Sequence, residues 1–175
     1  LPISRNIRCK MGVLDGFRGQ WDPGIIAISR LDMELRAGAD DAESAHLISR
    51  SLFRKFPKIL VHTVEVADAT LRWGFSERTQ GSIEGSTLRV MRSDGILKLV
   101  FRGGTFSQNW LRNLEIANLV VVCNPEGIIF EKAEFRQGGG TVDLVGLKII
   151  GGERPSAKGL AKVRNLPLEN VLPSA

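Results

Sequence analysis

The sequence predicts a mainly β protein with one amphipathic helix (α+β), in which the strands form an antiparallel, twisted meander sheet. The sheet is predicted by runs in which apolar residues alternate with polar ones, and by the turn signals that separate these runs, many of them among the 19 glycines. One segment, residues 41–56, instead has apolar residues at intervals of three and four, which predicts the helix. If successive strands place their apolar faces on one side, the sheet is expected to curl into an open groove.

The composition is that of a folded domain. The 175 residues suit one domain, residues 1–175, with a sizeable core. Apolar residues make up 43% of the chain and charged residues 25%, which excludes a disordered protein. The sequence begins at Leu1 rather than at a methionine, so we expect a fragment of a longer protein. Within it we expect the helix over 41–56, a strand-rich region over 57–150 and an irregular tail over 151–175.

The part of the chain before the helix is predicted to form strands. Alternating residues predict two or three strands between residues 6 and 36, broken by glycine. Ile26 and Ile28 are out of phase with Leu31, and a shift of one residue is typical of a β-bulge.

The predicted helix has a start, a stop and an apolar face. Asp40 or Asp41 is expected to cap its first turn, and Pro57 is expected to end it. The apolar residues of this face need a sheet or another helix to cover them. They are Ala45, Ile48, Leu52 and Phe56.

From residue 59 onward the chain is predicted to run from strand to strand. Turn signals at Ser93–Gly95, Asn124–Gly127 and Gly138–Gly140 favour hairpins between neighbouring strands. The spacing of the runs indicates a meandering antiparallel sheet. The expected strands cover residues 61–73, 82–91, 96–102, 111–123, 128–136 and 141–150.

Two of these strands share a short pattern. Val66–Ala69 and Ile116–Leu119 both consist of an apolar residue, Ala, an Asx residue and a further apolar residue. Asp and Asn bond their own backbone and tolerate bulge conformations. The match therefore indicates a repeating strand unit with a phase change at each Asx residue.

The net charge of +5 could suggest a polyanion partner, but the distribution of the basic residues gives this little support. The basic residues are scattered, and the densest run, between Arg50 and Lys58, lies where cations are favourable at a helix C-terminus. No ladder of base-stacking aromatic residues accompanies them, which disfavours nucleic acid as a partner.

Neither the cysteines nor the histidines form a reactive pattern. Cys9 and Cys123 lack metal-site spacing; we expect two buried thiols, with a disulfide in an oxidising compartment as the alternative. His46 and His62 lack the partners of a catalytic triad. Gly151–Gly159 departs from the phosphate-binding loop motif, because Ala157 occupies a glycine position and Gly159 the Ser/Thr position. The sequence therefore predicts no catalytic residue, no metal, no cofactor and no enzyme.

Residues 57–173 resemble the AsmA-like and TamB-like proteins of bacterial envelopes. The resemblance is carried by Ile59–Trp73 (ILVHTVEVADATLRW), which has a polar kink and ends in an aromatic residue, and by Gly81–Gly85 leading into a strand. It continues in Leu111–Phe135 and in Gly138–Leu172, where the glycine-rich GGGTVDLVGLKI precedes a short apolar segment.

This resemblance implies a long sheet curled into an apolar groove, in a protein of lipid transport or outer-membrane maintenance. We therefore expect a non-catalytic module of the cell envelope, located in the periplasm. Its partners are expected to be lipid or another envelope protein. The residues expected to contact lipid are Val64, Val66, Leu71, Trp73, Leu114, Ile116, Leu119, Val121, Ala133 and Phe135.

Two other interpretations remain open at this point. The same ten residues would also suit a closed core without a ligand, because apolar alternation usually marks a core. Alternatively, the chain is a protein-interaction or structural module of a cell-surface or secretion assembly, in which open edge strands recruit partner strands.

Overall fold

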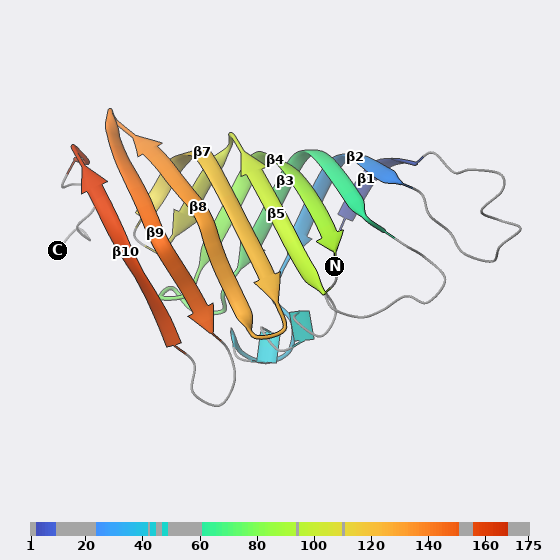
Figure 1. Ribbon diagram of the computed structural model, residues 1–175, viewed down its shortest axis with the longest axis horizontal. Coiled ribbons are helices and arrows are strands. Elements are labelled where there is room, and N and C mark those ends of the chain that lie inside the picture. Colours follow the sequence, from blue (N-terminus) through green and yellow to red (C-terminus); the bar gives the residue numbers. More distant parts are fainter. Residues whose placement is uncertain are drawn as a thin grey trace, which may run out of the picture.

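The computed structural model describes residues 3–9, 24–41, 43–44, 47–48, 61–93, 95–109, 111–150 and 156–167. These residues form one sheet of ten strands, which follow one another along the long axis of the molecule (Figure 1). The predicted mainly β class is confirmed. The strands are β1 (Ile3–Cys9), β2 (Ile25–Glu34), β3 (Thr63–Trp73), β4 (Gly81–Ser93), β5 (Ile96–Arg102), β6 (Thr105–Gln108), β7 (Leu111–Asn124), β8 (Gly127–Gln137), β9 (Gly140–Ile150) and β10 (Ser156–Arg164).

The strands pair almost entirely in sequence order, as a meander does. The order across the sheet is β1-β2-β3-β4-β5-β7-β8-β9-β10, and β6 pairs with β4 and β7. Every pair is antiparallel except β2 with β3, which is parallel. A parallel pair needs a long connection, and β2 and β3 are separated in the sequence by residues 35–62. The antiparallel meander is thus confirmed, with one parallel pair that the sequence analysis did not predict.

Strands β5 and β6 lie end to end at the same position in the sheet. Both lie between β4 and β7, and Gly103 and Gly104 separate them with φ values of 66° and 70°. These glycines stay within the sheet, because Gly103 donates its backbone N–H to the Ile116 carbonyl and Ile116 donates to the Gly104 carbonyl, both at 3.0 Å. The two glycines therefore interrupt the regular strand conformation without leading the chain out of the sheet.

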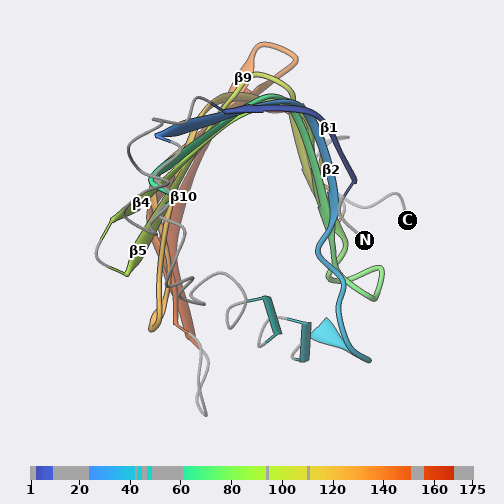
Figure 2. The same ribbon diagram turned by 90° about the vertical axis from the view of Figure 1, so that its right-hand side faces the viewer.

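The sheet bends into an arch, which Figure 2 shows from one end of the molecule. The register of β3 against β4 shifts between Val66 and Ala69, and that of β7 against β8 shifts between Ile116 and Asn118. Bulges bend a strand and increase its twist. The repeated pattern in the sequence therefore corresponds to two bulges, as predicted. Between them, Gly85 of β4 has a φ of 65°, and Gly103 and Gly104 lie beside it.

The bend divides the sheet into two arms. The first arm, on the side where Figure 2 labels β4 and β5, contains residues 63–66, 88–93, 96–101, 119–124, 127–130 and 147–150. The second arm contains residues 69–73, 81–84, 105–108, 111–116, 133–137 and 140–144.

The core lies on the concave face of the arch. In a single sheet, side chains become buried where the curvature brings them together, which is the inner side. The fully buried side chains include Phe135, Leu114, Ile116 and Leu119, each at most 2% exposed. Charged residues such as Glu65, Arg89 and Lys98 lie on the outer face, one position along from the apolar ones.

Two expected elements require correction. Residues 41, 43–44 and 47–48 have helical backbone, but no helix with defined ends occurs in the described part of the chain, so the helix over 41–56 is not supported. Of its expected apolar face, Ala45, Leu52 and Phe56 lie outside the described residues. The tail expected to be irregular instead contributes β10. Among the described residues, no helix is long and apolar enough to span a membrane.

The start of the expected helix does have the predicted cap. Asp40 Oδ1 accepts the backbone N–H of Glu43 at 2.8 Å, and the Asp40 carbonyl accepts that of Ser44 at 2.9 Å. Glu43 Oε2 in turn accepts the backbone N–H of Ala39 at 2.6 Å. This reciprocal arrangement satisfies backbone donors of a first turn. The turn lies at the open side of the arch (Figure 2).

Candidate apolar site on the concave face

Strand register places the ten predicted lipid-contacting residues on one face. In the first arm, Val64 lies opposite Val90, Val90 opposite Leu99, and Leu99 opposite Val121. Directly opposed residues of antiparallel strands share a face. All ten belong to one apolar cluster, either as buried members or packed against it.

Burial divides this cluster into a packed centre and two flanks. Val66, Leu88, Phe101, Leu119 and Ala133 form one row across five strands, and each is at most 4% exposed. These side chains have their contacts within the protein and present almost no surface to a ligand. For the centre of the arch, the closed-core interpretation therefore describes the packing.

The flanks are different, because their apolar side chains are only half-buried. Of the ten predicted residues, Val64, Trp73 and Val121 belong to the flanks, whereas the other seven are buried. The structure adds flanking residues beyond the ten predicted ones: Ile28, Leu31, Met33, Leu35, Val90, Leu99, Phe106, Leu111, Phe130, Leu144 and Leu166. Any ligand on this face would contact the flanks rather than the centre.

An aromatic row lines the second arm. The ring centroids of Trp73 and Phe106 are 6.2 Å apart, and those of Phe106 and Phe135 are 4.8 Å apart, both in tilted arrangements. Trp73 donates its indole N–H to Gln108 Oε1 at 2.9 Å. The polar edge of the indole is thus satisfied by the rim of the arm, and its apolar body adds to the concave face.

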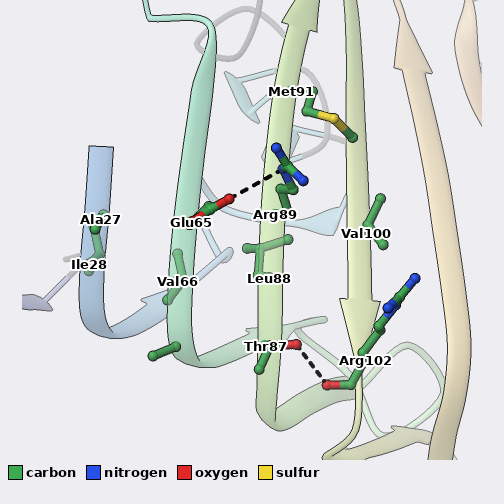
Figure 3. A pocket seen from close by; sticks show the side chains of 11 residues that line it. Ala27, Ile28, Glu65, Val66, Thr87, Leu88, Arg89, Met91, Val100 and Arg102 are labelled. Carbon is green, nitrogen blue, oxygen red and sulfur yellow. Dashed lines mark hydrogen bonds and ion pairs between the residues drawn. The ribbon is translucent and has the colours of Figure 1, made fainter. Parts of the chain in front are cut away.

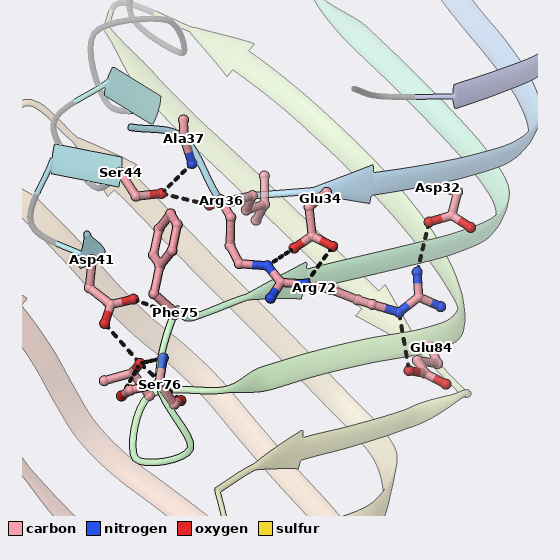
Figure 4. Close-up of polar contacts among 12 residues, drawn as sticks. Asp32, Glu34, Arg36, Ala37, Asp41, Ser44, Arg72, Phe75, Ser76 and Glu84 are labelled. Carbon is pink, nitrogen blue, oxygen red and sulfur yellow. Dashed lines mark hydrogen bonds and ion pairs between the residues drawn. The ribbon is translucent and has the colours of Figure 1, made fainter. Parts of the chain in front are cut away.

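The rim of the second arm also binds the chain that follows β2 (Figure 4). Asp41 accepts the backbone N–H of Phe75 at 3.0 Å through Oδ1 and the hydroxyl of Thr79 at 2.8 Å through Oδ2. The buried Ser44 hydroxyl donates to the Leu35 carbonyl at 2.8 Å and accepts the Ala37 backbone N–H at 3.0 Å. Leu35, Ala37, Asp41 and Ser44 are therefore held at the open side of the arch, with Asp41 bonded to this rim.

Ion pairs on the outer face support the same region. Arg36 binds Glu34 through two hydrogen bonds, of 2.6 and 2.9 Å, and these bonds lower the pKa of Glu34 below its ordinary value. Arg72 of β3 contacts Asp32 of β2 at 2.9 Å and Glu84 of β4 at 3.7 Å (Figure 4). All of these side chains are partly exposed, so they contribute modestly to stability.

A depression of about 570 Å³ lies on the outer face of the first arm (Figure 3). Arg89, which lines it, is paired with Glu65 at 3.4 Å. The Thr87 hydroxyl donates to the Arg102 carbonyl at 3.1 Å. Val66 and Leu88 also border it, although their side chains belong to the apolar cluster. The charges of Glu65 and Arg89 in this depression therefore partly neutralise each other.

The two cysteines cannot bond to each other. Cys9 lies in β1 and Cys123 in β7, and four strands separate β1 from β7 in the sheet. Neighbouring strands are about 4.8 Å apart, whereas a disulfide needs Cα atoms within about 7 Å. Cys123 is a free, buried thiol, and its burial raises its pKa. The side chain of Cys9 lies outside the described residues.

The flanking residues that were not predicted differ in whether a local sequence pattern marks them. Val90 follows Leu88, and Leu99 lies between Leu97 and Phe101, at intervals of two residues in predicted strands. Their inward orientation could therefore have been derived from the period alone. Phe106 lies in β6, which has only four residues between Gly104 and Asn109. Such a short run carries no clear alternation, and the pairing with β4 and β7 is what places Phe106 inside.

Compared with known proteins, the chain matches no family model, no curated protein and no solved structure.

Proposed function

We propose that the chain is a non-catalytic module of the cell envelope that binds lipid acyl chains along the concave face of its arch. This proposal is supported by the flanks of the cluster, where apolar residues of successive strands line both arms and remain half-buried. The resemblance to AsmA-like and TamB-like proteins, with their apolar groove, points the same way and suggests the periplasm.

The energetics of such binding are favourable for long chains. Removing a methylene group from water contributes about 0.8 kcal/mol. About a dozen methylenes would then offset the loss of freedom on association, which is of the order of 4–15 kcal/mol. Extended acyl chains match a face that continues from strand to strand, whereas a compact polar ligand does not.

Photocrosslinking offers a direct test with internal controls. A benzophenone amino acid would be placed at Leu99 or Val121, which face inward, and at Val100 or Val122, their outward neighbours on the same strands. Illumination with a radiolabelled fatty acid is expected to label the inward positions several-fold more strongly. Equal labelling of both sets would reject the concave face as the acyl-chain site.

Charge substitution gives a second readout of the same site. Val121→Asp places a carboxylate among the half-buried apolar residues and is expected to abolish binding of a fluorescent fatty acid. Circular dichroism would verify that the variant keeps its sheet. Unchanged affinity in a folded Val121→Asp protein would contradict the proposal.

A second candidate function is that of a protein-interaction or structural module in a cell-surface or secretion assembly. It is favoured by β10, whose nine residues are all exposed and which pairs only with β9 among the described strands. An edge strand presents unpaired backbone groups to a partner strand. Light scattering that shows specific oligomers without lipid, lost in Ala161→Pro, would support this function over acyl-chain binding.

A further inference from the structure

The rim of the first arm carries a group of exposed isoleucines. Ile96 is 46% exposed, Ile149 38%, and Ile128 and Ile150 37% each. We call these four residues the isoleucine rim. Exposed apolar residues are ordinary when single, but a group of large ones at one edge indicates an interaction site.

The members of the isoleucine rim come together through strand register. Ile128 lies opposite Ile149, and Ile150 lies opposite Gly127, at the ends of β8 and β9. Ile128 also lies opposite Cys123 on β7, which in turn lies opposite Leu97, the residue after Ile96. Ile96 therefore belongs to the same edge of the sheet.

A row of lysines runs along the outer face just above this rim. Lys98 lies opposite Val122, Val122 opposite Ile129, and Ile129 opposite Lys148. Lys158 of β10 continues the row, because it lies opposite Lys148. The row thus combines cationic with aliphatic side chains.

Most of the cations near the rim are not neutralised. Lys98 is paired with Glu131 at 2.6 Å, and no ion pair involves Lys132, Lys148 or Lys158 within the described residues. Their ammonium groups are available to an anionic partner.

The rim of the second arm has a different chemistry. Gln108 accepts the indole N–H of Trp73 and donates to Asn109 Oδ1 at 2.9 Å. Gln137 donates to the Arg112 carbonyl at 2.7 Å. Beside the exposed Phe75, these groups of the second rim are hydrogen-bonded and polar, so the two rims are not equivalent.

We propose that the isoleucine rim and the lysine row dock the first arm onto an anionic membrane surface. The isoleucines enter the interface while the lysines contact lipid phosphates, an arrangement in which apolar burial and electrostatic attraction add. The aliphatic side chains between the lysines suit a lipid interface better than nucleic acid, which would need stacking aromatics. This docking is independent of acyl-chain binding on the concave face.

Vesicle sedimentation tests the proposal. The protein is expected to sediment with vesicles of phosphatidylcholine and phosphatidylglycerol in equal amounts, and to be released by added salt. It is expected to remain in solution with vesicles of phosphatidylcholine alone. Equal sedimentation with both kinds of vesicle, or with neither, would overturn the proposal.

Paired variants separate the two contributions. Lys148→Gln with Lys158→Gln is expected to weaken partitioning by about fivefold for each lysine. Ile96→Ser with Ile150→Ser is expected to weaken it by about tenfold, because less apolar surface enters the interface. Unchanged partitioning in either folded pair would overturn the assignment of this rim.

Controls lie on the opposite rim and on the concave face. Phe75, in the loop between β3 and β4 at the rim of the second arm, is 39% exposed, and Phe75→Ser is expected to leave partitioning unchanged. Val121→Asp is expected to abolish fatty-acid binding while vesicle binding persists, so failure of one proposal is distinguishable from failure of the other. Binding to duplex DNA that survives Ile96→Ser with Ile150→Ser and competes with vesicles would identify a polyanion site instead.

Discussion

The Asp41 carboxylate accepts the Thr79 hydroxyl at 2.8 Å and joins two segments that are 38 residues apart in the chain. The same carboxylate accepts the backbone N–H of Phe75, so Asp41→Ala removes both bonds. Hydrogen bonds to charged groups contribute about 1.5–3 kcal/mol, less when exposed. We expect Asp41→Ala to lower the free energy of unfolding by about 1–2 kcal/mol, as measured by urea denaturation.

A double-mutant cycle isolates the pair. Thr79→Val removes the hydroxyl and leaves the Phe75 bond intact. Both single changes remove the same hydrogen bond. The loss of unfolding free energy in the double variant is therefore expected to be smaller than the sum of the two single losses. Additive losses would show that the two residues do not stabilise each other.

Much of the sheet could be predicted from the sequence, because its signals are local. The Asx residues at Asp68 and Asn118 tolerate bulges, and both bulges lie at or beside these positions. Asn124 accepts the backbone N–H groups of Glu126 and Gly127, at 3.0 and 2.9 Å, and so closes the predicted turn. At Gly138 and Gly139, positive φ values of 54° and 80° close the predicted hairpin.

Other features depend on contacts that no local pattern reveals. The parallel pairing of β2 with β3 joins strands that are far apart in the sequence, and β6 depends on strands on both sides of it. For the candidate site, the sequence predicted on which face of the sheet each side chain lies, but not how deeply it is buried. Alternation places Val121 and Leu119 on the same face, but only the curvature of the arch decides that Leu119 is buried and Val121 half-buried.

Gly104 is predicted to be the most sensitive glycine of the bend. Its φ is 70°, and a Cβ there would meet the backbone of Glu84 and Gly85. We expect Gly104→Ala to lower the free energy of unfolding by about 2–5 kcal/mol, from left-handed strain together with overpacking. Gly139 is the matched control, since its φ is 80° and nothing lies within 4 Å of its Cβ position.

The control variant should show only the energetic cost of the left-handed backbone conformation, without overpacking. Gly139→Ala is expected to lower the free energy of unfolding by about 1–2 kcal/mol in the same urea titration. Equal effects of the two substitutions would mean that the close approach of Gly104 to β4 does not limit the bend.

Phe135 is predicted to stabilise the packed centre of the arch. It is 2% exposed and contacts the ring of Phe106. Phe135→Ala would leave a cavity among residues that curvature holds in place, and we expect a loss of about 3–5 kcal/mol in the free energy of unfolding. Phe75→Ala, in an exposed loop, is expected to change it by less than about 0.5 kcal/mol. A small effect of Phe135→Ala would indicate that the two arms can close over the gap.

Cys123 is predicted to make stability decrease at alkaline pH. Burial raises the pKa of its thiol above the ordinary value of 9.0, so the folded protein holds this proton more tightly than the unfolded chain does. The stabilisation is fully present below pH 9.0 and is lost as the pH rises from there through the folded-state pKa. The measurement is the free energy of unfolding of the native protein and of Cys123→Ala, from neutral pH to above 9.0. The two proteins differ only at residue 123, so the difference between the two curves isolates the thiol. A difference that stays constant with pH would show that burial does not hold the proton on Cys123.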